Sequence, residues 1–136
     1  MKTAIRYFSK FGHTKKMANI VGEITGAKPE LVDVPISEPV DVLYLGAGVF
    51  MGKVDKSIDK FIEKLNPVLV KCVVCFGSCA IIKSPVPQMR NMLEKKGVKV
   101  SEKEFTCKGS MGPLHMGHPN KQDLEMFKQF INSTLS

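Results

Sequence analysis

Hydroxyl, glycine and histidine side chains gather near the start of the chain, directly after an apolar run. The stretch "YFSKFGHTKK" places Ser9, Gly12, His13 and Thr14 between an extended pattern and a helical one. A helix N-terminus offers backbone N–H groups without intrahelical partners and the positive end of a dipole. Hydroxyl donors there, with a glycine that lets the backbone approach, would form a phosphate seat. Ser9 and Thr14 could equally cap the helix, and the residues alone leave both interpretations open.

This loop matches none of the common motifs that bind nucleotides or carry phosphate chemistry. It has neither the Gly-Lys-Ser/Thr ending of a Walker loop nor the G-x-G-x-x-G of a dinucleotide fingerprint. A receiver domain is excluded because Ser9-Lys10 and Gly46-Ala47 stand where it needs acidic residues. A low-molecular-weight phosphatase is excluded because the loop has no cysteine.

Two further strand ends carry small or polar residues. The segments Gly46–Lys53 and Gly77–Ala80 lie at the ends of the apolar runs "VLYLGAGVF" and "CVVCFGSCA". In an open parallel sheet, ligands bind beyond the carboxyl ends of the strands, where the strand order reverses. Together with Ser9–Thr14, these ends predict one ligand site at a single edge of the sheet.

Extended and helical patterns alternate along the chain. The extended patterns cover Thr3–Phe8, Glu30–Val34, Val40–Leu45, Leu69–Phe76 and Val98–Thr106. The helical patterns cover His13–Thr25, Val54–Leu65, Pro85–Lys96 and Lys121–Leu135, with Ser84 and Asn120 as expected caps of the last two. This order predicts an α/β fold with a doubly wound five-stranded parallel sheet and helices on both faces. No helix is evident between the second and third extended patterns.

Composition limits the classes of protein that fit. A chain of 136 residues suits one domain, expected to span residues 1–136. The net charge of +7 comes from lysines spread over helix faces, which favours a solvated surface over nucleic-acid binding. The four cysteines form no disulfide framework, which indicates a reducing compartment. With no signal peptide visible and no apolar stretch near the ~20 residues of a membrane span, we expect a cytoplasmic protein.

Cysteine and histidine spacings offer weaker signals of chemistry. Cys72 and Cys75 lie in one strand at an odd separation, so they should point to opposite faces and share a metal poorly. A redox pair of Cys79 and Cys107 stays open. The His115-x2-His118 spacing has no carboxylate or cysteine nearby and is more typical of a surface loop than of a metal site.

Three quoted stretches resemble the flavodoxin family. "SKFGHT" resembles its phosphate loop, "GAGVFMGKVDKSIDKFIEKL" is similar to the third-strand loop of short-chain flavodoxins, and "CFGSCA" resembles the loop over the other face of the ring. The resemblance spans essentially the whole chain. It implies the strand order 2-1-3-4-5 known from flavodoxin, with FMN at the switch point, and electron transfer as the function.

The resemblance also implies roles for individual residues. Met51 would pack on one flavin face, and Gly52 would present its peptide carbonyl to N5–H of the half-reduced ring. Only glycine adopts both peptide conformers at low cost. The phosphate would be held by Ser9, Lys10, Phe11, Gly12, His13 and Thr14. The ring would be bordered by Gly48, Phe50 and Lys53 from the second loop and by Gly77, Ser78 and Cys79 from the third.

Two departures from the family pattern affect these expectations. Flavodoxins commonly stack a Tyr or Trp on the ring, but this chain has no Trp, and Tyr7 and Tyr44 lie inside extended patterns. Looser FMN binding follows, and Phe50 is a substitute whose side chain could equally face the core. Flavodoxins are typically acidic around the flavin, whereas this chain is basic and carries Lys53 after Met51-Gly52. We therefore expect a less negative second reduction potential and redox protein partners with an acidic docking surface.

Three functions remain compatible with these residues. The first is an FMN-binding, low-potential electron carrier, which the resemblance favours over a self-sufficient enzyme. The second is an FMN oxidoreductase of the quinone-dependent protoporphyrinogen oxidase type, which carries a long insertion before its last strand that this chain lacks. The third is a flavin-free binding module on the same fold.

Overall fold

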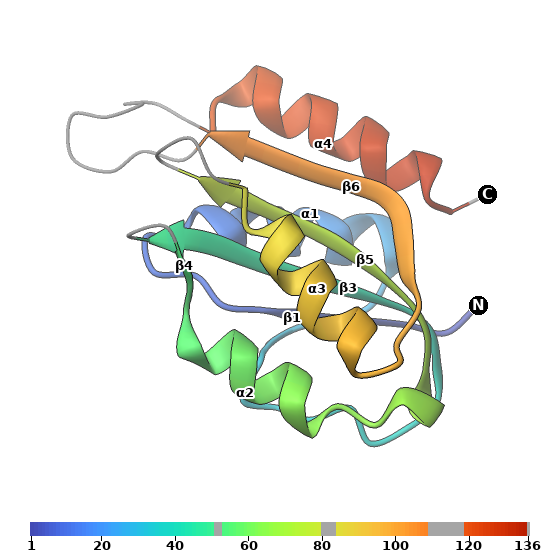
Figure 1. The fold of residues 1–136 in the computed structure, drawn as a ribbon. Helices are drawn as coiled ribbons and strands as arrows, with labels where there is room; N and C mark the ends of the chain where they lie inside the picture. The colour runs from blue at the N-terminus through green and yellow to red at the C-terminus, as the bar shows by residue number, and fades with distance from the viewer. Residues whose placement is uncertain (51–52, 80–83, 109–118, 136) are drawn as a thin grey trace.

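The computed structural model describes residues 1–50, 53–79, 84–108 and 119–135, with the backbone alone for Phe50 and Lys108. Strands and helices alternate along the chain (Figure 1). The strands are β1 (Thr3–Tyr7), β2 (Pro29–Leu31), β3 (Val40–Phe50), β4 (Lys53–Val54), β5 (Val70–Cys79) and β6 (Val100–Lys108). The helices are α1 (His13–Thr25), α2 (Lys56–Lys64), the 3-10 turn η1 (Pro67–Leu69), α3 (Val86–Lys95) and α4 (Lys121–Ser133).

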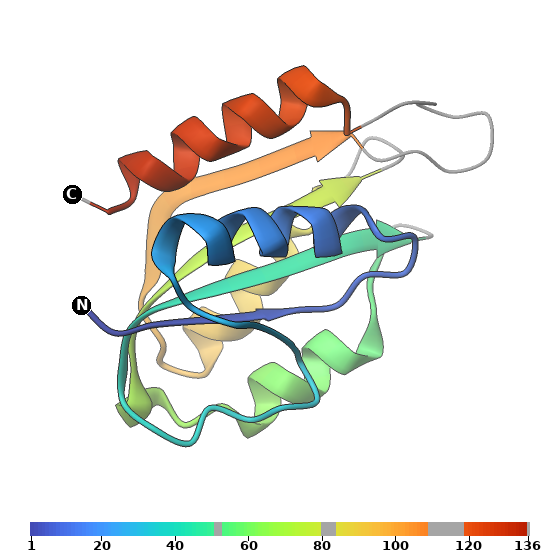
Figure 2. The same ribbon diagram turned by 180° about the vertical axis from the view of Figure 1, so that it is seen from behind.

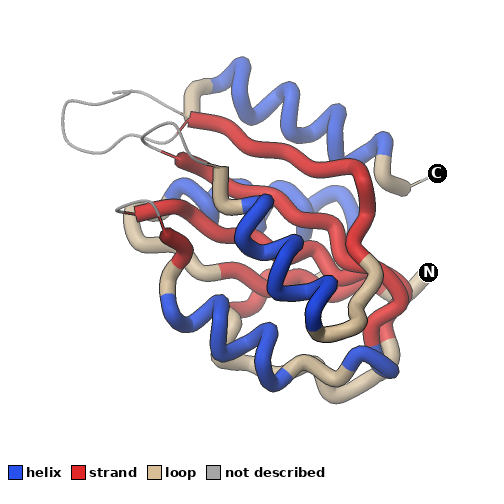
Figure 3. Tube along the Cα trace, in the orientation of Figure 1, coloured by secondary structure: helices blue, strands red, loops and turns tan. Residues whose placement is uncertain are grey.

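One sheet carries the fold. Its parallel strands run in the order β2-β1-β3-β5-β6, and the short β4 pairs antiparallel with β3 (Figure 3). The five parallel strands therefore follow the predicted order 2-1-3-4-5. In the register, Tyr7 pairs with Gly46 and Gly48 pairs with Ser78, so β1, β3 and β5 end at the same edge.

Helices cover both faces of the sheet, as predicted. α1 and α4 contact each other on one face, and α2 and α3 contact each other on the other (Figures 1 and 2). Successive side chains of β5 point to opposite faces of the sheet and therefore enter different cores. Phe76 packs on the α1–α4 side, and Cys75 packs on the α2–α3 side. The first core is rich in aromatic rings, and the ring centroid of Phe127 lies 5.3 Å from Phe76 and 5.2 Å from Phe105.

The central strands are longer than predicted. β3 continues past Leu45 to Phe50, and β5 continues past Phe76 to Cys79. The predicted loops Gly46–Lys53 and Gly77–Ala80 are therefore largely strand. Their small residues keep the parallel ladder, with Ala47 paired with Gly77, and this pairing satisfies backbone groups that a loop would leave to solvent.

The second helix begins later than the periodicity predicted, because the chain first folds back on β3. β4 takes up Val54, and Asp55 then caps α2 by accepting a hydrogen bond from the Ser57 backbone N–H. α3 also starts one residue late, with Pro85 at the N-cap position and the Ser84 hydroxyl accepting from Val86 N–H at 3.1 Å. The predicted cap at Asn120 is confirmed, in a reciprocal capping box with Asp123.

The first edge strand is shorter than predicted. β2 ends at Leu31 rather than Val34, and the chain leaves the sheet there. The Arg6 guanidinium, which is 8% exposed, holds the departing segment by donating to the carbonyls of Val34 at 2.7 Å and Pro35 at 3.2 Å. It also pairs with Glu30 at 3.2 Å. These hydrogen bonds replace the sheet ladder for residues 34–35.

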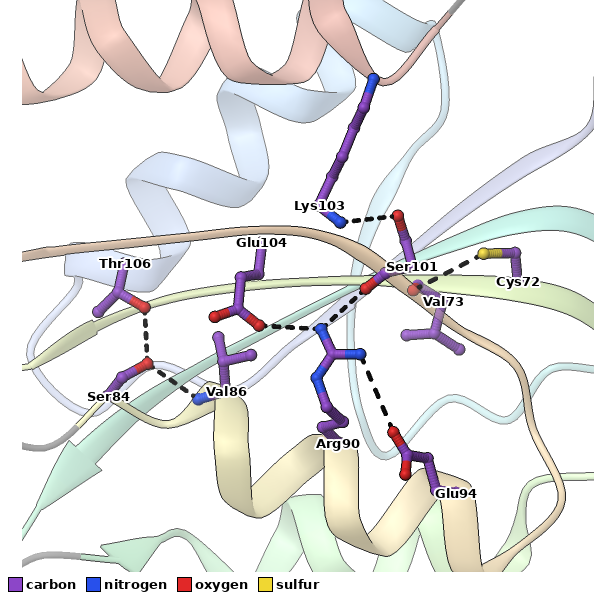
Figure 4. A network of polar contacts seen from close by, with 10 residues as sticks. All are labelled: Cys72, Val73, Ser84, Val86, Arg90, Glu94, Ser101, Lys103, Glu104 and Thr106. Atoms are coloured by element: carbon purple, nitrogen blue, oxygen red, sulfur yellow. Dashed lines mark hydrogen bonds and ion pairs between the residues drawn. The ribbon is translucent and has the colours of Figure 1, made fainter.

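The other edge strand, β6, begins two residues later than predicted and is tied to α3 by Arg90. This guanidinium donates to the Glu104 carboxylate at 2.9 Å and to the Ser101 carbonyl at 2.8 Å (Figure 4). At the carboxyl end of β6, the hydroxyls of Thr106 and Ser84 lie 2.7 Å apart (Figure 4). α3 is thus anchored to β6 along its length.

Helix length bears on membrane insertion. The longest described helices, α1 and α4, have 13 residues each. A helix needs about 20 apolar residues to cross a bilayer. Within the described ranges, no helix could therefore span a membrane.

Candidate functional site

A cavity of about 320 Å³ lies at the carboxyl edge of the sheet, where the β1–α1 loop, the end of β3 and the start of α2 meet. Eight of the residues predicted for the site line it, namely Ser9, Lys10, Phe11, His13, Thr14, Gly48, Lys53 and Ser78. Its other lining residues are Phe8, Val49, Val54, Asp55 and Lys56. The structure therefore brings the first and second predicted loops together with one residue of the third.

The N-terminus of α1 has a glycine as its N-cap residue. Gly12 occupies the N-cap position with φ of 87° and has no side chain to cap the helix, and within the described residues the hydroxyls of Ser9 and Thr14 make no capping hydrogen bond. The interpretation of Ser9 and Thr14 as helix caps is therefore wrong. A Cβ on Gly12 would meet nothing within 4 Å, so the left-handed conformation, rather than crowding within the protein, requires glycine here.

The hydroxyl groups of Ser9 and Thr14, which do not cap α1, line the cavity. Thr14 is 2% exposed, and its Oγ1 lies 3.3 Å from the Oγ of Ser78, which is itself buried. The Ser9 Oγ is buried and has no hydrogen-bond partner among the described residues. A buried hydroxyl without a partner costs about 1–3 kcal/mol. An acceptor in the cavity would remove that cost.

Glycine leaves space beside this hydroxyl pair. A Cβ on Gly48 would lie 3.5 Å from the Ser78 Oγ and 3.7 Å from the Thr14 Oγ1, at ordinary contact distances. The space beside the hydroxyls is thus open because the side chain is absent. Gly77 differs: its Cβ would lie 2.1 Å from the Ala47 carbonyl oxygen and 2.5 Å from Pro85, so packing explains that glycine.

Positive charge dominates the cavity wall. Lys10, Lys53 and Lys56 line it, against a single carboxylate at Asp55. Hydrogen bonds from Ser57 hold the pKa of Asp55 below its usual value, and the charges of Lys10 and Lys56 act in the same direction. Asp55 therefore stays ionised at neutral pH, and the lining keeps a net positive charge suited to an anion.

Five residues that line this cavity were not named as site residues from the sequence, although one of them, Val49, lies within the predicted segment Gly46–Lys53. Phe8 could have been found from strand alternation, which places it on the same side as Ala4 and Arg6 and beyond the last paired residue of β1. Asp55 also carried a signal, because an aspartate two residues before Ser57 is typical of a helix N-cap. No comparable pattern marked Val54, which reaches the cavity through its β3–β4 pairing with Val49.

Other predicted site residues do not line the cavity or fall outside the described part. Gly12, Gly77 and Cys79 are described but are not among its lining residues. Met51, Gly52, His115, His118 and the side chain of Phe50 lie outside the described residues. Both tyrosines are buried inside strands, as predicted, and the aromatic side chains seen at the cavity are Phe8 and the half-exposed Phe11.

The thiols are poorly placed for metal or disulfide chemistry. In the register, Ser78 pairs with Cys107 and Cys79 pairs with Lys108, so Cys79 and Cys107 point to opposite faces of the sheet. Burial raises the pKa of Cys107, as it does that of Cys75, to about 12. All four thiols are free, and no cluster of three His, Cys, Asp or Glu residues suited to a metal occurs in the described ranges.

Comparisons with known proteins agree with this fold. A Methanocaldococcus jannaschii protein, MJ0298, is 31% identical to the chain, and the match covers 99% of both. The structure of a flavodoxin from the domain Archaea superposes with a TM-score of 0.79 at 20% identity, covering 98% of this chain and 95% of that one. A flavoprotein in complex with FMN from Lactobacillus acidophilus gives 0.63 at 18% identity, covering 79% and 92%. The flavodoxin domain family Flavodoxin_5 matches residues 4–132, and the chain belongs to this family.

Proposed function

We propose that the protein is an FMN-binding electron carrier and that the cavity holds the FMN phosphate. The buried Ser9 hydroxyl carries the proposal, because it has no partner in the described part of the chain and lines a cavity with a net positive wall. The hydroxyls of Thr14 and Ser78 lie in the same wall. A phosphate would supply an acceptor for the Ser9 hydroxyl and for the second hydroxyl proton of the Thr14–Ser78 pair, which their mutual hydrogen bond does not use.

The residues of the first loop would hold the phosphate by position as well as by charge. α1 begins at His13 with Gly12 as its N-cap, so the backbone N–H groups of its first turn lie beside the cavity that His13 and Thr14 line. Phosphate oxygens would accept from these N–H groups and from Ser9 and Thr14. Lys10 would add attraction at the cavity wall.

FMN, when bound, supplies the one-electron chemistry, and the protein supplies binding, orientation and electrostatics. Lys53 and Lys56 would favour a negative charge on the cofactor. The basic surface would favour redox partners that present acidic side chains. Four free thiols suit a reducing compartment such as the cytoplasm.

FMN titration of the apoprotein tests this function. Ser9→Ala and Thr14→Ala should each weaken FMN by roughly 1–3 kcal/mol, the cost of one charge-assisted hydrogen bond. The double variant should bind FMN at least about tenfold more weakly. Riboflavin, which lacks the phosphate, should bind the wild-type protein more weakly than FMN and should not distinguish the variants.

A matched control removes two hydroxyls elsewhere. Thr25 and Ser133 bond to backbone carbonyls near the C-terminal ends of α1 and α4, and neither lines the cavity. Thr25→Ala/Ser133→Ala should keep the wild-type FMN affinity. Equal FMN affinity in the Ser9/Thr14 double variant and the wild type would refute the phosphate site, and absence of any FMN binding would refute the function.

A further inference from the structure

A second cavity, of about 430 Å³, forms a groove between α2 and the segment that follows β2. Its apolar lining consists of Phe8, Leu31, Val32, Pro35, Ile36, Phe61 and Leu65, and its polar lining consists of Asp33, Ser57, Lys60 and Lys64. We call it the α2 groove. Phe8 belongs to both cavities, so its side chain lies between the groove and the cation-lined cavity.

The groove lies where the chain omits a helix. The connection from β2 to β3 crosses β1 with the eight residues 32–39, and it contains no helix. Parallel crossovers normally take about a dozen residues or more and usually include a helix that covers the sheet. Figure 2 shows this connection passing beneath the sheet and alongside α2. The face beside β1 and β2 therefore lacks the layer that a crossover helix would supply.

The lining of the groove extends along the whole of α2. Residues 57, 60, 61 and 64 form a stripe along one face of the helix, and the C-cap residue Leu65 continues it. Eight helical steps of 1.5 Å give a length of about 12 Å, which is about two turns of a second helix. This shape suits a polypeptide segment better than a compact ligand.

The charged residues that line the groove indicate which kind of polypeptide segment it could bind. Lys60 and Lys64 are exposed, lie one helical turn apart and have no ion-pair partner in the described part of the chain. Asp33 is the one acidic residue in the lining. Apolar side chains extend the surface, since Leu31 is 46% exposed in the groove and the neighbouring Val34 is 38% exposed. An apolar stripe flanked by carboxylates would match both features.

We propose that the α2 groove binds an acidic amphipathic helix of a partner protein, in the place that the missing crossover helix leaves open. The partner's apolar side chains fill the groove between Phe61 and Ile36, and its carboxylates pair with Lys60 and Lys64. This mode is helix-in-groove recognition. The inference does not depend on FMN, because no cationic residue of the groove lines the other cavity.

Peptide titration followed by amide NMR shifts tests the proposal. The probe is a synthetic helical peptide with leucines at i, i+3, i+4 and i+7 and with flanking glutamates four residues apart. Its twin carries lysines in place of the glutamates. The acidic peptide should shift amides of residues 31–36 and 57–65 and should bind more weakly in high salt. Lys60→Glu/Lys64→Glu should weaken it about tenfold and should favour the basic twin.

The control carries the same change of charge on the opposite face. Lys121→Glu/Lys128→Glu on α4 should leave the peptide affinity unchanged, and both double variants should keep the wild-type FMN affinity. Equal binding of the acidic peptide to both double variants, or no binding up to millimolar concentration, would overturn the proposal. A dimer of the protein that Lys60→Glu/Lys64→Glu abolishes would assign the groove to self-association and would also overturn it.

Discussion

The two cavities that share Phe8 differ in how the fold makes them. The cation-lined cavity lies where strand ends meet the starts of α1 and α2, so helix-start backbone N–H groups and hydroxyls come together there. The α2 groove lies where a crossover runs without a helix, so some apolar side chains of its lining, such as Leu31 and Pro35, remain exposed. We infer that the first suits an anion and that the second suits an apolar surface with acidic flanks.

On these two proposals, a single fold supports two kinds of recognition. Polar groups collect where elements end, because helix and strand termini leave backbone groups without regular partners. Apolar surface collects where a covering layer is missing, because a sheet face needs a partner to bury it. Substitutions that change one cavity and leave the other unaltered therefore test whether the two cavities have different roles.

The largest effect is expected from removing the clamp beside the groove. Arg6→Met deletes a guanidinium that donates to the carbonyls of Val34 and Pro35 and pairs with Glu30. The loss should cost roughly 2–4 kcal/mol of unfolding free energy, because two part-buried carbonyls and a carboxylate lose their partner. Urea unfolding measures it. Arg90→Met, which removes a more exposed pair with Glu104, should cost roughly 1 kcal/mol, and equal losses would contradict the role of Arg6.

Alanine substitutions at two glycines of β3 should affect FMN affinity and fold stability differently. Gly46→Ala places a Cβ 2.4 Å from the Phe76 ring and should destabilise the fold by roughly 1–3 kcal/mol. Gly48→Ala makes ordinary contacts with Ser78 and Thr14, so stability should change by less than about 1 kcal/mol. The same methyl group fills the space beside the hydroxyl pair, and FMN affinity should fall about tenfold. Thermal unfolding measures the change in stability, and FMN titration measures the change in affinity. Wild-type FMN affinity in Gly48→Ala would contradict the prediction.

The smallest effect concerns charge at the cavity. Lys53→Glu should shift the second one-electron potential of bound FMN to more negative values, because a cation favours the anionic reduced cofactor. Screening at this exposed side chain limits the shift to at most about 40 mV, and added salt should reduce it. Lys60→Glu, in the groove, should leave the potential unchanged. Spectroelectrochemistry that finds no shift for Lys53→Glu, or a positive one, would remove this electrostatic role.

Much of the fold was predictable because it rests on local patterns. The apolar periodicity of His13–Thr25 and the capping residue Asn120 specify helices from neighbours in the chain, and both are confirmed. Alternation along single strands also placed Cys72 and Cys75 on opposite faces, with Cys75 in the core beside α2 and α3. The family resemblance added the strand order, which no local pattern specifies.

Tertiary contacts decided the remaining features. β3 and β5 extend to Phe50 and Cys79 because their glycines pair with residues of the neighbouring strand. The periodicity of a single segment carries no information about this pairing. Ser9 and Thr14 read equally well as caps or as ligand donors, and only the helix start at Gly12 separates the two. The α2 groove depends on Arg6 reaching a carbonyl 28 residues away, at Val34. The sequence thus determined which segments form helices and strands, whereas long-range pairing decided where those segments end and what their ends enclose.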